Sequence, residues 1–239
     1  HRMIEQHLVN KKSLDQKMLL SEREEILKPL RVVRESLEQN NNENLASGEL
    51  LDLMRRAKCF GINLVRLDIR QESSRHSQLI GELVKRKYNK DYLRFSENEK
   101  IKFLKSKLNS SKNIINKFKF KNKENKEVWD TFNVLSQEPD ECLGAYVISM
   151  TSSASDILSV SFLQKEAKIK NKLRVVPLFE TLEDLINAKP IMENLFSQKW
   201  YRKLTNHKQE VMIGYSDSSK DAGKMCASWH QYKAQEEIV

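Results

Sequence analysis

Cysteine is scarce in this sequence, and the few cysteines are far apart. Cys59, Cys142 and Cys226 show neither the CxxC spacing of a zinc site nor the density of a disulfide framework. The five histidines show no HxxxH or His/Cys spacing either. We therefore expect reduced, mostly structural thiols and no zinc site.

Long hydrophobic runs are also missing. No apolar stretch approaches the length needed to cross a bilayer, and nothing resembles a signal peptide. We expect a soluble, cytoplasmic chain that has no membrane partner. The chain begins with His1 and stops at Val239 inside a helix-like pattern, so we also expect an internal piece of a larger protein.

Arginine is scarce where the positive charge is concentrated. Much of the net charge of +9 lies between Lys85 and Lys126, in a stretch rich in lysine and asparagine. Base-reading and bidentate phosphate contacts favour arginine, so we interpret this stretch as a solvated helix face and expect no nucleic-acid partner. A basic RNA-binding module remains an alternative, which would require salt-sensitive binding that depends on the lysines of residues 100–126.

The first part of the chain, residues 1–60, reads as a helical segment. Apolar residues recur at helical spacing over 27–37 and again over 50–57. Ser47 is the predicted cap of the second helix, and Gly61 is its predicted end.

Four units of strand, polar corner and helix make up residues 61–239, the part that we assign to a single larger catalytic domain. The predicted strands cover 62–69, 145–150, 173–179 and 211–215. Units repeated in one direction imply parallel strands joined by helical crossovers, as in doubly wound sheets and barrels. Both architectures bind ligands at the carboxyl ends of their strands, so we expect a shared active face there.

The corner after the last predicted strand is the most polar of the four. An apolar run ends at Ile213, and acids, a lysine and hydroxyls follow within residues 216–221. Gly214 lets another backbone or a ligand approach closely. An ordinary helix start, with Ser216 or Asp217 as the cap, is the alternative.

Two carboxylates on separate strand ends suit a divalent metal ion. Glu180 follows the third predicted strand, and Asp217 follows the fourth. Oxygen ligands with the remaining positions left to water and substrate are typical of Mg²⁺ or Mn²⁺. The alternative is that each acid caps the helix that follows it.

Two cations complete the candidate site. Arg70 presents a planar fork suited to carboxylate or phosphate, and Lys220 is a compact point charge or proton donor. A salt bridge of Arg70 with Asp68 or Glu72 is the alternative. A divalent ion with these cations suggests a small, multiply anionic substrate such as a phosphorylated acid.

Four blocks of the sequence resemble successive blocks of the phosphoenolpyruvate carboxylase family, in the same order and with similar spacing. They are VRLDIRQESSRHS at 65–77, GAYVISM at 144–150, LRVVPLFETLEDL at 173–185 and KQEVMIGYSDSSKDAGKM at 208–225. The resemblance runs from about Leu45 to Val239. It implies an (α/β)8 TIM-type barrel with many additional helices, of which this chain holds only part.

The resemblance also implies a reaction and its site. Phosphoenolpyruvate and bicarbonate would give oxaloacetate and phosphate, by way of carboxyphosphate and a metal-stabilised enolate, in a cytoplasmic homotetramer that requires Mg²⁺ or Mn²⁺ and feeds the tricarboxylic acid cycle. The implied metal ligands are Glu180 and Asp217, the implied substrate-binding residues are Arg70, Leu178 and Met212, and the implied catalytic residue is Lys220.

The chain departs from the family pattern in places. The corner Thr151–Ser155 lacks the family's proline, and Ser219 stands where alanine or glycine is commoner. The family's catalytic histidine and its glycine-arginine loop are expected before and after this chain, so we expect the isolated fragment to be inactive. Another Mg²⁺-dependent phosphoenolpyruvate or pyruvate enzyme on a similar barrel is the alternative function.

Overall fold

The computed structural model describes residues 23–62, 64–139 and 142–239, and the chain divides into two compact units between Arg66 and Leu67. The first unit is helical. Its described helices are α2 (Arg23–Gln39), α3 (Glu43–Ser47) and α4 (Glu49–Phe60).

Both helices predicted in the first unit are confirmed, with one correction. Helix α4 ends at Gly61, whose φ of 61° suits glycine and whose N–H bonds back to the carbonyl of Ala57. The predicted cap, Ser47, is wrong. Gly48 occupies the N-cap position of α4, and the Ser47 hydroxyl is already donated to a carbonyl of its own helix, α3, at 2.8 Å. Residues 1–22 of the predicted helical segment lie outside the described residues.

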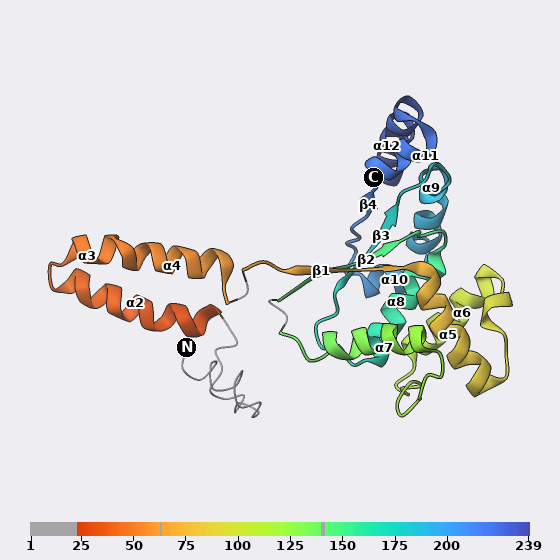
Figure 1. Ribbon diagram of the computed structural model, residues 1–239, viewed down its shortest axis with the longest axis horizontal. Coiled ribbons are helices and arrows are strands. Elements are labelled where there is room, and N and C mark those ends of the chain that lie inside the picture. Colours follow the sequence, from red (N-terminus) through yellow and green to blue (C-terminus); the bar gives the residue numbers. More distant parts are fainter. Residues whose placement is uncertain (1–22, 63, 140–141) are drawn as a thin grey trace. The chain divides into compact units, whose positions relative to one another are not determined.

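A parallel four-stranded sheet organises the second unit, which confirms the predicted α/β class with helical crossovers. The strand order follows the chain from β1 to β4, and Figure 1 shows the strands side by side. The strands are β1 (Leu67–Glu72), β2 (Leu143–Ser149), β3 (Arg174–Phe179) and β4 (Met212–Ile213).

Helices connect the strands and pack along the sheet (Figure 1). They are α5 (Ser73–Tyr88), η2 (Tyr92–Arg94), α6 (Glu97–Asn109), α7 (Lys123–Leu135), α8 (Ala154–Glu166), α9 (Leu182–Phe196), α10 (Lys199–Leu204), α11 (Ser216–Ala222) and α12 (Lys224–Ile238). Capping boxes open α6, α8 and α9, because each has a Ser or Thr cap and an acid at its third position. Among the described residues, none of the helices is long and apolar enough to cross a membrane.

All four strands differ from their predicted bounds, and pairing explains the difference for the first and the last. The first begins at Leu67 instead of Ile62, because pairing with β2 starts at Leu67 and the preceding apolar side chains, such as Leu64 and Val65, are exposed. The last is limited to Met212–Ile213, because its partner β3 ends at Phe179. An apolar, branched composition favours extended backbone, but a strand also needs a paired neighbour.

The sheet has two different faces, because side chains alternate along each strand. Tyr146 and Ile148 of β2 point into the main core, together with residues of the surrounding helices. The opposite face carries a small separate cluster of buried residues, Ala145, Val147, Val176 and Leu178, with Met212 packed against it. No residue of a described helix belongs to this second cluster, whose members are nevertheless buried.

The lysine-rich stretch covers parts of the helical face. The ammonium groups of Lys100, Lys105 and Lys107 lie 5.7, 5.5 and 4.7 Å from the ring centroids of Tyr92, Trp200 and Tyr88. In cation–π contacts of this kind, the lysine side chains pack against aromatic rings of the same protein. Our interpretation of the stretch as a solvated helix face stays a prediction.

A buried histidine joins helix α5 to the sheet. His76 is fully buried, and its Nε2 lies 2.7 Å from the hydroxyl oxygen of Tyr146, whose ring stacks on Phe132. Its Nδ1 has no hydrogen-bond partner among the described residues. Burial, together with the smaller effect of the nearby positive charge of Arg75, lowers the pKa of His76 to about 3.

The free energy of unfolding should therefore fall in acid. The folded state keeps His76 neutral, whereas the unfolded chain binds a proton near pH 6.5, so the contribution is complete above pH 6.5 and is lost as the pH falls towards 3. The expected loss is at most about 1.4 kcal/mol per pH unit. Urea unfolding at several pH values between 7 and 4 measures this loss in the free energy of unfolding. His76→Gln should flatten this dependence, and the exposed control His207→Gln should not; equal slopes for the two variants would contradict the assignment.

Candidate functional site

Arg70 and Met212 meet across the helix-free face of the sheet. Arg70 lies within β1, in register with Val147, and not after the strand as its predicted bounds required. Its Nη2 reaches the sulfur of Met212 on β4 at 3.9 Å, although β1 and β4 are the outer strands of the four. Leu178, the register partner of Met212, is buried beneath this contact. The guanidinium of Arg70 therefore lies over apolar side chains of the sheet.

Glu180 follows β3 directly and faces charges from other elements. Burial is the main cause that raises the pKa of its carboxyl, and the negative charges of Asp217 and Asp184 raise it further. The Met150 N–H, 3.4 Å from Oε2, and the positive charge of Arg70 oppose this shift. Glu180 and Asp217 are thus close enough to repel each other, and a bound cation would relieve the repulsion.

Met150 has an unusual backbone conformation at this site. Its φ of 53° is in the left-handed region, which a non-glycine residue rarely adopts. The Ser73 hydroxyl donates to its carbonyl at 2.6 Å, and this turn aims the Met150 N–H at Glu180. This contact could not be predicted from the sequence, because no pattern of side chains indicates a backbone donor.

Lys220 and Asp217 form an ion pair at 3.1 Å on α11. Both side chains are exposed, so the pair contributes little to stability. Its importance is positional, because it keeps an ammonium group beside one of the two candidate metal ligands.

The structure does not support the alternative roles considered for these charges. Thr181 and Asp184 cap helix α9, so the carboxylate of Glu180 is not used as a cap. Tyr215 is the N-cap of α11, with no side-chain cap bond, so neither Ser216 nor Asp217 has that role.

The alternative salt bridge of Arg70 is also absent from the part of the chain that the structure describes. Asp68 accepts instead from the Ala145 N–H at 2.7 Å, and Glu72 accepts from the Ser74 hydroxyl at 2.6 Å. The guanidinium of Arg70 is therefore available to an anion.

Gly214 brings the two carboxylate corners together. Its N–H donates to the carbonyl of Phe179 at 2.7 Å, which continues the pairing of β3 with β4 by one residue. A Cβ at this position would lie only 3.0 Å from the Cα of Glu180 and 3.1 Å from its Cγ. The close approach predicted at Gly214 is confirmed, and its neighbour is Glu180.

The donor set fits a divalent ion that keeps several of its waters. Within the described ranges, no group of three or more His, Cys, Asp or Glu side chains could hold a metal ion by itself. The pair Glu180 and Asp217 offers oxygen ligands and leaves positions for water and substrate, which is the arrangement that Mg²⁺ accepts. Burial is the main cause of the raised pKa of Glu180, and such an ion would offset the smaller contribution from the negative charge of Asp217.

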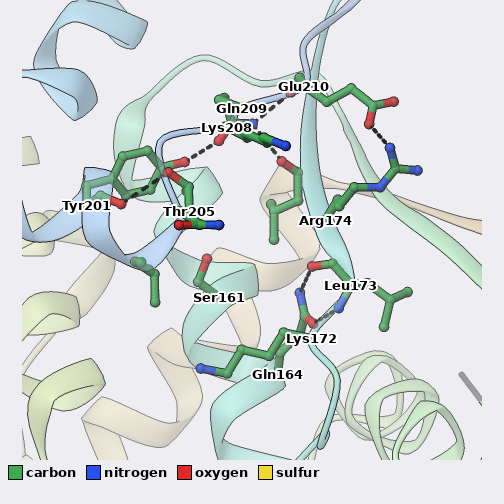
Figure 2. Close-up of a pocket in the computed structure, with 13 residues that line it drawn as sticks. Ser161, Gln164, Lys172, Leu173, Arg174, Tyr201, Thr205, Lys208, Gln209 and Glu210 are labelled. Carbon is green, nitrogen blue, oxygen red and sulfur yellow. Dashed lines mark hydrogen bonds and ion pairs between the residues drawn. The ribbon is translucent and has the colours of Figure 1, made fainter.

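A cavity of about 630 Å³ lies away from this site, at the amino end of β3 (Figure 2). Its buried polar groups satisfy one another: Gln164 bonds both backbone groups of Leu173, and Tyr201 donates to Gln209. Arg174 pairs with Glu210. The figure shows Lys172 and Lys208 on different sides of the cavity. The charged side chains around the cavity do not point at one common position, and we assign no catalytic or binding role to the cavity.

The fold and the site define an α/β protein whose acids and cations gather at the carboxyl edge of a parallel sheet. A family profile described as phosphoenolpyruvate carboxylase matches residues 1–239. Phosphoenolpyruvate carboxylases of Proteus mirabilis, Flaveria pringlei and Escherichia coli are 45%, 46% and 47% identical to the chain over 99%, 90% and 92% of its length. The chain belongs to the phosphoenolpyruvate carboxylase family, which confirms the resemblance. It spans 27%, 22% and 25% of these relatives.

Gly214→Ala should displace Glu180 and destabilise the sheet edge, because the added methyl group would meet the backbone of Glu180 and Phe179 as well as the Cγ of Glu180. We expect a loss of about 1–3 kcal/mol in the free energy of unfolding, measured with urea. The matched control is Gly81→Ala within α5, where the methyl group would meet only the flexible side chain of Leu93. That variant should be neutral or gain up to about 1 kcal/mol from helix propensity. Equal stabilities for the two variants would count against the close contact at Gly214.

Proposed function

We propose that this chain forms part of a phosphoenolpyruvate carboxylase, which carboxylates phosphoenolpyruvate with bicarbonate to give oxaloacetate and phosphate. The observation that carries the proposal is that the charges of Arg70 and Asp217 act on Glu180, while Arg70 contacts Met212, the register partner of Leu178. These are the side chains that a small phosphorylated carboxylic acid requires. Family membership over the whole chain supports the same reaction.

We also propose that the sheet is a consecutive part of an (α/β)8 barrel. Its strand order runs in one direction from β1 to β4, whereas a doubly wound sheet reverses its order at a switch point. The helices pack on one face only, as they do around a barrel, and the opposite face carries a small cluster of side chains, as a barrel interior does. The carboxyl ends of the strands would then form the active face.

The chain's own residues would divide the work of the reaction. Arg70 would hold the carboxylate or phosphate of phosphoenolpyruvate, because its guanidinium is free and lies over the sheet face. Attack of a bicarbonate oxygen on phosphorus breaks the bond between phosphorus and the enol oxygen, giving carboxyphosphate and the enolate of pyruvate. Carboxyphosphate then yields phosphate and CO2, which the enolate carbon attacks. Leu178 and Met212 would exclude water from that carbon. Lys220 would hold bicarbonate or its carboxyl product.

Glu180 and Asp217 would hold Mg²⁺ or Mn²⁺. An ion bound there would supply positive charge that offsets the negative charge growing on the enolate oxygen during the reaction. The cytoplasmic homotetramer and the link to the tricarboxylic acid cycle belong to the same proposal, as does the inactivity of the 239 residues alone.

Asp217→Asn in a full-length carboxylase containing this sequence should raise the Mg²⁺ concentration for half-maximal activity by at least about tenfold, because an amide is a weaker ligand than a carboxylate. Oxaloacetate formation at varied Mg²⁺ measures this. Asp52→Asn, which changes an exposed acid of α4, is the control and should leave the Mg²⁺ response unchanged. A normal Mg²⁺ response in Asp217→Asn would remove Asp217 from the ligand set.

Lys220→Ala in the same protein should lower kcat by about 100-fold and change the KM for phosphoenolpyruvate less, because the lost cation serves the carboxyl group being transferred. Steady-state rates at saturating Mg²⁺ separate the two constants. Lys224→Ala, an exposed lysine at the start of α12, should retain full activity. Unchanged turnover in Lys220→Ala would exclude the role proposed for this residue.

A further inference from the structure

Asp221 joins the two corners that carry the candidate metal ligands. Its Oδ2 accepts from the backbone N–H of Leu182 at 2.9 Å, across 39 residues of sequence. Leu182 is the first residue of α9 and lies two residues after Glu180, while Asp221 lies one helical turn after Asp217. Within the described part of the chain, this is the one side-chain hydrogen bond between α11 and α9.

Helix α11 is held at its other end by different contacts. The Ser218 hydroxyl donates to the carbonyl of Gly214 at 2.7 Å, and Gln231 of α12 donates to the Ser218 oxygen at 2.6 Å. These bonds attach the start of α11 to β4 and α12 but not to α9. The bond from Asp221 therefore ties the far end of α11 to the Glu180 corner.

The same bond controls the direction in which Asp217 points. Residues four apart lie on one face of a helix, so Asp217 and Asp221 share a face of α11. Anchoring Asp221 to the start of α9 limits rotation of α11 about its axis. It thereby keeps the Asp217 carboxylate beside Glu180.

We propose that Asp221 is a positioning residue that sets the separation of the Glu180 and Asp217 carboxylates through its bond to the Leu182 N–H. The proposal rests on the metal site of the proposed function and adds a residue that holds the site without touching the ion. An asparagine side chain has an oxygen that can accept the same N–H, so Asp221→Asn keeps the bond and removes the charge. Asp221→Ala removes both.

Isothermal titration calorimetry of the 239-residue chain with Mn²⁺ alone tests this positioning role. Asp221→Ala should weaken Mn²⁺ binding by about tenfold, the effect typical of losing a partner that orients a ligand. Asp221→Asn should bind within about twofold of wild type. Glu183→Ala is the matched control, because it removes an exposed carboxylate beside Leu182 without removing the acceptor. It should bind Mn²⁺ normally.

Amide hydrogen exchange at Leu182 gives an independent readout of the bond itself. Protection should fall in Asp221→Ala and persist in Asp221→Asn, and both variants should keep the wild-type circular dichroism spectrum. Normal Mn²⁺ binding by Asp221→Ala would overturn the positioning role alone. Equal losses in the alanine and asparagine variants would also overturn it, because the charge and not the bond would then matter. If the wild-type chain does not bind Mn²⁺, or if Glu180→Gln and Asp217→Asn bind it normally, the metal site of the proposed function fails as well.

Discussion

The short pairing of β3 with β4 is the contact on which the candidate site depends. Two register pairs, Leu178 with Met212 and Phe179 with Ile213, end both strands at the same level. Glu180 follows one strand at once, and the polar corner of α11 follows the other. The parallel direction of the pair puts both corners at one edge of the sheet, so the charge of Asp217 acts on Glu180 although the two are far apart in the sequence.

The two faces of the sheet have separate tasks. On the helical face, large residues such as Tyr146 and Phe179 are fully buried, and burying each side chain of this size stabilises the fold by about 1.5–3 kcal/mol. On the other face, small and medium side chains form a shallow apolar floor that Arg70 crosses. Most of the large buried side chains therefore lie on one face, whereas the other face combines a smaller apolar cluster with the charged side chain of Arg70.

Regular elements were predicted well from the sequence, because they depend on local patterns. The two helices predicted in residues 1–60 form as α2 and α4, and α4 ends at Gly61 as predicted. Strand bounds were less accurate, because pairing and not composition decides where β1 and β4 begin and end. The acids and cations of the site could be predicted because each follows the end of a predicted strand. The contacts that hold these corners together could not be predicted, because they involve backbone groups that are distant in the sequence from their partners, such as those of Gly214 and Met150.

The left-handed turn at Met150 has a consequence for how this corner tolerates change. Its contribution to Glu180 is a backbone N–H, so the side chain at this position can vary without deleting the donor. Glycine would even relieve the strain of a positive φ, whereas proline would remove the donor. A comparison of side-chain identities would therefore pass over this residue. A contact made by a backbone group can thus persist through substitutions at the very position that makes it.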